Sequence, residues 1–150
     1  MLEYAGVARI FLERRDLGEE ARRLFDLLER EQAAGTAGEC VPPLDVLETA
    51  STVEIVLDLP GVAAEDIQVV FGKGVIVIGG RKLPPGCEHG DAAFHLAERA
   101  FGGFARAVRL NGAFDAGRAT ATLSAGELRI VLPRIEERRG RELRIPVTAQ

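Results

Sequence analysis

The chain has 150 residues, enough for one domain with short appendages. Hydrophobic residues make up 47%, charged residues 28%, and the formal net charge is -4, a balance typical of a soluble globular protein that disfavours general nucleic-acid binding. Because no apolar run approaches the ~20 residues of a membrane span, and the N-terminus lacks a signal-peptide pattern, we expect no membrane segment and a cytoplasmic location.

Residues 9–33 are predicted to form an amphipathic helix. Apolar side chains recur at helical spacing in one stripe, made of Leu17, Ala21, Leu24, Phe25 and Leu28. The same stripe would serve a surface helix packed on its own domain or an arm that docks on other subunits or on unfolded proteins, so the pattern leaves both open. Gly35 and Gly38 then end the helix and indicate a flexible linker.

Two strands are expected after this linker. Residues 44–48 form a short one, and residues 52–59 form a clearer one that ends at Pro60-Gly61, a turn pair. One face of the second strand carries Val53, Ile55, Leu57 and Leu59.

Another pair of strands follows. Ile67, Val69 and Phe71 alternate along one strand, and residues 72–74 turn the chain. The run 75–78 is continuously apolar, which is typical of a strand covered on both faces. Gly79 and Gly80 are predicted to end this strand.

Residues 83–97 make a long connection, in which 93–97 are a possible short strand carrying Phe94 and Leu96. A loop of this length in a compact domain is either a surface excursion or a functional element. Its Cys87, His89 and His95 match no standard zinc spacing and lack a fourth ligand, so we expect no metal or other cofactor. Cys40 and Cys87 are expected to be reduced and unpaired.

Three further alternating segments complete the expected fold. Their apolar faces carry Phe104, Val108 and Leu110, then Ala119, Ala121 and Leu123, then Leu128, Ile130 and Leu132. Ala125-Gly126 predicts a tight hairpin between the last two strands, and Pro133, which has no N–H, is predicted to end the last one. Seven or more short strands with closely spaced turns indicate an all-β, antiparallel, immunoglobulin-like sandwich.

The chain therefore divides into a helical arm at 1–41, a β-sandwich at 42–134 and a tail at 135–150. The tail opens with a charged connector that cannot build a core. Residues 143–147 are then mostly apolar again, and Ile145 and Val147 point the same way in an extended segment.

Short motifs occur in order along the sandwich and tail. They are DLPGV at 58–62; Glu98-Arg99 with Phe101-Gly102, Phe104 and Arg106; Ala121, Gly126 and Leu128 with Pro133-Arg134; and Ile145-Pro146-Val147. Together they resemble the signatures of the α-crystallin domain and tail of small heat-shock proteins. The length of the loop at 83–97 resembles that of the bacterial and plant class of this family. The resemblance covers residues 42–147.

This resemblance implies an ATP-independent chaperone, a holdase, that binds partly unfolded proteins and prevents their aggregation. It also implies a homo-oligomer built from strand-exchanged dimers, in which the long loop pairs with the first strand of a second subunit. The dimer contact would then join Phe94 and Leu96 to Leu44 and Val46. The residues expected to bind clients on the arm are Leu17, Leu24, Phe25 and Leu28.

For the tail, the resemblance implies that Ile145 and Val147 anchor in an apolar groove on a neighbouring subunit. The groove residues would be Ile67, Val69 and Phe71 on one strand and Ala119, Ala121 and Leu123 on another. The alternative is that residues 143–147 fold back as a last strand of their own domain.

Two other classes of function fit the sequence less well. A monomeric β-sandwich module, like related co-chaperone domains, would generally lack the tail motif and the G-x-L hairpin. An enzyme is disfavoured because Ser51 and Ser124 lack a G-x-S-x-G elbow, and neither a phosphate-binding loop nor paired carboxylates stand out. We therefore expect unfolded proteins and copies of the chain as partners, and neither nucleic acid nor membrane.

Overall fold

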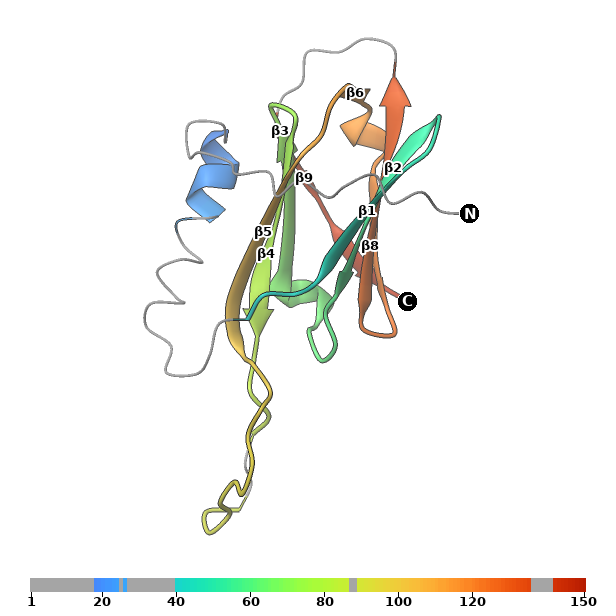
Figure 1. The fold of residues 1–150 in the computed structure, drawn as a ribbon. Coiled ribbons are helices and arrows are strands. Elements are labelled where there is room, and N and C mark those ends of the chain that lie inside the picture. Colours follow the sequence, from blue (N-terminus) through green and yellow to red (C-terminus); the bar gives the residue numbers. More distant parts are fainter. Residues whose placement is uncertain (1–17, 25, 27–39, 87–88, 136–141) are drawn as a thin grey trace.

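The computed structural model describes residues 18–24, 26, 40–86, 89–135 and 142–150. They form a two-layer β-sandwich, so the predicted fold class is confirmed (Figure 1). The strands of the first sheet, in spatial order, are β1 (Leu44–Glu48), β2 (Thr52–Asp58), β8 (Glu127–Ile135), β7 (Thr120–Ser124) and β10 (Val147–Ala149), with β6 (Ala113–Phe114) also on β8. Those of the second sheet are β5 (Gly102–Arg109), β4 (Val75–Lys82), β3 (Ile67–Gly72) and β9 (Leu143–Ile145). All neighbours are antiparallel except β10 on β7.

The core lies between the two sheets, where the alternating apolar faces meet. From β2 and β8 it receives Ile55, Leu57, Leu128, Ile130 and Leu132, which are completely buried. Opposite them lie Val69, Ile76, Ile78 and Phe104 from the second sheet. Phe71 and Phe114 meet edge to face at 6.1 Å between ring centroids, an arrangement that aromatic pairs prefer.

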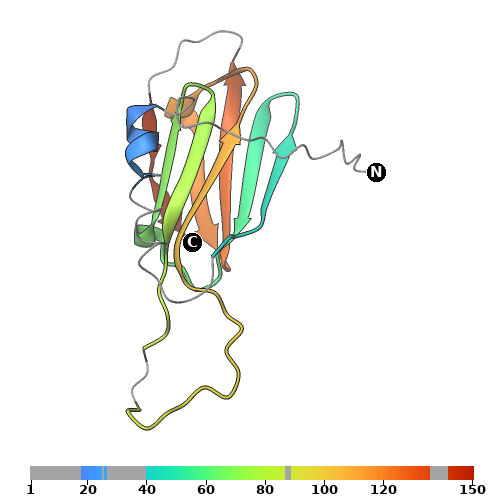
Figure 2. The same cartoon turned by 60° about the vertical axis from the view of Figure 1, so that its left-hand side comes forward.

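Strand β4 is buried on both faces, as its continuous apolar run predicted. Ile76 and Ile78 point into the core, whereas Val75 and Val77 belong to a second cluster on the outer face of the sheet. Ala21 and Leu24 of a helical segment at 19–24 pack in that cluster, and Figure 2 shows the segment beside β3 and β9. Most of the helix predicted over 9–33 lies outside the described residues.

Two tight hairpins fix the strand register. Ala125 and Gly126 have φ of 51° and 77°, and Lys73 and Gly74 have φ of 52° and 71°. Positive φ at both central residues matches the right-handed twist of the strands that such turns join. The predicted hairpin at Ala125-Gly126 is therefore confirmed, and Lys73-Gly74 makes a second one.

The prediction that Pro133 ends the last strand is wrong. Strand β8 continues past it to Ile135. On one side of β8, β7 pairs up to Val131 and β6 pairs from Arg134, so Pro133 lies in the gap between these two partners. On the other side, the ladder to β2 continues, and the N–H of Arg134 donates to the carbonyl of Ser51 at 2.8 Å. Because no partner strand faces Pro133 in this gap, its missing N–H breaks no ladder hydrogen bond.

One smaller prediction is also wrong. Gly79 and Gly80 do not end β4, which continues to Lys82, because both glycines remain paired with β3 and β5. Residues 93–97 form no strand in the single chain, where the described part of the loop projects away from the sandwich without a neighbouring ladder (Figure 2). Among the described residues, no helix is long and apolar enough to cross a membrane.

Candidate partner-binding surfaces

The tail lies along the edges of both sheets. Strand β9 pairs antiparallel with β3 and places Ile145 opposite Val69, and β10 pairs parallel with β7 and places Val147 opposite Ala121. Between the two strands, the exposed Pro146 is where the tail crosses from one sheet to the other. The tail thus closes the open side of the sandwich.

Ile145 is the main anchor of this contact. It is only 3% exposed and belongs to the core cluster, whereas Val147 is half-buried and packs against that cluster. Val147 pairs with Ala121, and two residues along β7 the carbonyl of Leu123 accepts a hydrogen bond from the N–H of Gln150 at 3.0 Å. Side-chain burial and strand addition both hold the tail.

Most of the residues expected in the groove meet the tail. Val69 and Phe71 lie in the paired part of β3, and Ala121 and Leu123 in the paired part of β7. Ile67 and Ala119 lie beyond the paired registers but contribute to the same core cluster. The docking occurs within one chain, which is the fold-back arrangement that the sequence left open.

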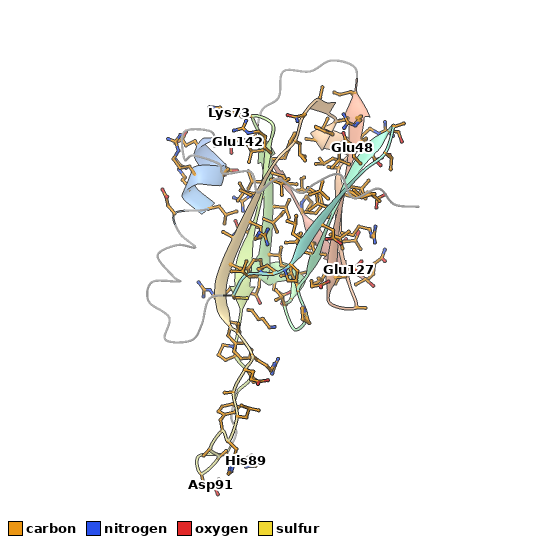
Figure 3. The ribbon with its side chains drawn as sticks, in the orientation of Figure 1. Glu48, Lys73, His89, Asp91, Glu127 and Glu142 are labelled. Atoms are coloured by element: carbon orange, nitrogen blue, oxygen red, sulfur yellow. The ribbon has the colours of Figure 1, made fainter. Side chains whose placement is uncertain are left out.

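The residues expected at the dimer contact lie in two separate places. Phe94 and Leu96 are 82% and 74% exposed on the long loop, whose tip carries His89 and Asp91 far from the sandwich (Figure 3). Val46 is exposed on β1, a terminal strand that pairs with β2, and Leu44 is half-buried against the core. A single chain does not bring these two places together.

Arginines from the sequence motifs hold both ends of β1. Nη1 of Arg106 on β5 donates to the carbonyl of Pro42 at 2.6 Å, just before β1 begins. Arg134 on β8 forms an ion pair with Glu48, the last residue of β1, and its guanidinium lies 5.2 Å from the Phe114 ring centroid. Sequence reasoning used these arginines as motif markers and missed this role, which needs the fold to be seen.

A cation–π cluster closes the base of the long loop. Lys82 Nζ and the Arg99 guanidinium lie 5.7 and 4.9 Å from the centroid of the Phe101 ring. Nearby, burial raises the pKa of the Cys40 thiol, and the positive charge of Lys82 partly opposes the shift. Within the described residues, which exclude Cys87, no three potential metal ligands gather.

The described part of the arm packs on the outer face of one sheet. Leu24 is buried against the outer face of the second sheet, together with Ala21. Leu17 and Leu28 lie outside the described residues, as does Phe25. Sequence reasoning also missed Glu142, at the end of the charged connector, whose carboxylate reaches this helix.

These features can be compared with known proteins. The model of the Hsp20/alpha crystallin family matches residues 45–148. The chain belongs to this family. It is 36% identical over 101 residues to heat shock protein 16 of Schizosaccharomyces pombe, a match that covers 67% of this chain and 71% of the yeast protein.

Two further comparisons agree. Small heat shock protein C4 of Rickettsia felis is 29% identical over 69% of this chain, which spans 63% of that relative. The solved structure of heat shock protein 16.0 from Schizosaccharomyces pombe has a TM-score of 0.63 and 34% identity over 69% of this chain and 94% of that one. Members of this family are chaperones rather than enzymes, so an enzymatic role is not supported.

Proposed function

We propose that this chain is an ATP-independent holdase that binds partly unfolded proteins and prevents their aggregation. The observation that carries the proposal is the family match over residues 45–148, which includes the sandwich and the tail motif. A holdase must offer apolar surface to an unfolding protein without aggregating itself, since large exposed patches favour association. Storing that surface beneath removable segments meets both needs.

The arrangement of the chain is consistent with this role. The tail covers two strand edges, and the helix at 19–24 covers an apolar sheet face. Neither covering segment takes part in the ladders among β1 to β8, so those ladders do not depend on either cover. A monomeric interaction module would have no evident need for such covers.

We also propose that two copies of the chain form a strand-exchanged dimer. The loop presents Phe94 and Leu96 to solvent, and β1 offers a terminal strand with Val46 exposed. Addition of the loop as a strand beside β1 of a second copy would satisfy its backbone groups and bury these side chains. The arginine contacts at both ends of β1 would keep this strand in place for its partner.

The test of the holdase is a light-scattering assay. The purified chain, at several-fold subunit excess and without ATP, should suppress the thermal aggregation of an unrelated heat-labile enzyme. An equal mass of a soluble protein outside the family is the control. Undiminished scattering would contradict the holdase, and a monomeric mass by size-exclusion chromatography with light scattering would favour the interaction module instead.

A further inference from the structure

The outer face of the β5–β4–β3 sheet is apolar and covered. Val70, Val75 and Val77 are each at most 1% exposed, and the half-buried Ala105 and Ala107 pack beside them. The cover comes from Ala21 and Leu24 on the helical segment 19–24 (Figure 2). If this segment left, a patch of three valines on one sheet face would reach solvent.

The covering segment depends on an acceptor from the tail. The first N–H groups of a helix have no partner within the helix. Here the Glu142 carboxylate accepts from the N–H groups of Ala21 at 2.9 Å and Glu20 at 3.3 Å. Its negative charge also interacts favourably with the helix dipole at that end. Glu142 therefore acts as a cap supplied from 121 residues away.

Glu142 is held in place by the strand that it precedes. Leu143 begins β9, so docking of β9 on β3 positions the carboxylate beside the helix, near the Lys73 turn (Figure 3). Glycines at 18 and 72 leave the space for it, since a Cβ at either position would collide with the Glu142 side chain. Arg144 adds a second link, with its guanidinium 2.6 Å from Gln68 Oε1 on β3 and 3.5 Å from Glu20 Oε1 on the helix.

We propose that the tail and the helix form one latch over this sheet face. When β9 leaves β3, the helix loses its cap and leaves as well, which uncovers Val70, Val75 and Val77. The uncovered face then binds apolar segments of unfolding proteins. The binding step rests on the proposed holdase function, whereas the coupling between tail and helix does not.

The test measures exposure of one side of β4 at a time. In full-length protein with Cys40→Ser and Cys87→Ser, Val77→Cys places a thiol on the covered outer face and Ile76→Cys places one in the core. Glu142→Ala should raise the alkylation rate of the first thiol by about fivefold, the factor expected when a helix cap is lost. Ile145→Gly with Val147→Gly should raise it further. Glu127→Ala, which removes an exposed glutamate on β8, is the control.

The core thiol separates opening of the latch from unfolding. In the Glu142→Ala variant, faster alkylation of the thiol at 77 with an unchanged rate at 76 supports the latch, whereas equal acceleration at both positions overturns it. An unchanged rate at 77 in the tail variant also overturns it. A permanently unfolded client protein, alkylated beforehand, is then added to the Glu142→Ala variant. It should slow alkylation of the thiol at 77, and an unchanged alkylation rate overturns the binding step. Aggregation suppression by the unmutated chain is scored separately, so the holdase and the latch can fail independently.

Discussion

At the residue scale, Gly80 lies where β4 leaves no room for a side chain. A Cβ there would be 2.4 Å from the carbonyl oxygen of Asp66 and 2.7 Å from Cζ of Phe104. One neighbour is backbone of the 3-10 turn η2 (Ala64–Asp66), and the other is a completely buried ring. Neither can move without disturbing the core, so glycine here permits close packing rather than marking the end of a strand.

Gly80→Ala should therefore destabilise the sandwich by about 1–3 kcal/mol, the usual cost of overpacking a core. Urea unfolding followed by far-UV circular dichroism would measure the change. Gly86→Ala is the matched control, because a Cβ at Gly86 meets no described atom within 4 Å. Equal stability of the two variants would show that the space at Gly80 is not limiting.

At the element scale, β1 and the long loop both carry exposed apolar side chains in the single chain. Leu47 and Val46 are exposed on β1, and Phe94 and Leu96 on the loop. Fastening of β1 by Arg106 and Arg134 is consistent with a strand that must keep its position while its outer edge stays available. The proposed dimer assigns this edge to the loop of a second copy.

Deletion of residues 84–95 should produce a folded monomer, because it removes the proposed exchanged segment and no strand of the described sandwich. Size-exclusion chromatography with light scattering gives the mass, and circular dichroism confirms the sheets. A variant with Phe94→Ser and Leu96→Ser keeps the loop length and should weaken the dimer through lost apolar burial. If the shortened chain keeps the mass of the parent, the loop is not the dimer contact.

At the scale of the whole molecule, local sequence patterns predicted the sandwich but not its long-range contacts. Period-two alternation identified the core of β2, β3 and β8, since one buried face suffices to produce it. The same pattern could not show that Pro133 lies between two partner strands, a matter of how β6 and β7 meet β8. Nor could it connect Glu142 with Ala21, because no spacing rule links residues 121 positions apart.

The docking of the tail, too, could be predicted only in part from the sequence. The anchors Ile145 and Val147 and the edges of β3 and β7 could be named from the motif, and the structure brings them together. Which chain supplies the edges is not encoded in the pattern, because a docked strand makes the same contacts in either case. Connector length and local concentration decide between the two arrangements.

Ile145→Gly with Val147→Gly tests the arrangement seen here. Ile145 is almost completely buried in the core cluster of its own chain. Removing a buried side chain of this size costs about 2–5 kcal/mol, so we expect a lower free energy of unfolding by that order. The loss should not depend on protein concentration, because docking within a chain involves no second molecule. Urea unfolding at two concentrations, with the mass measured in parallel, checks both points. A smaller assembly whose sandwich unfolds as before would mean that the tail docks on a neighbouring subunit.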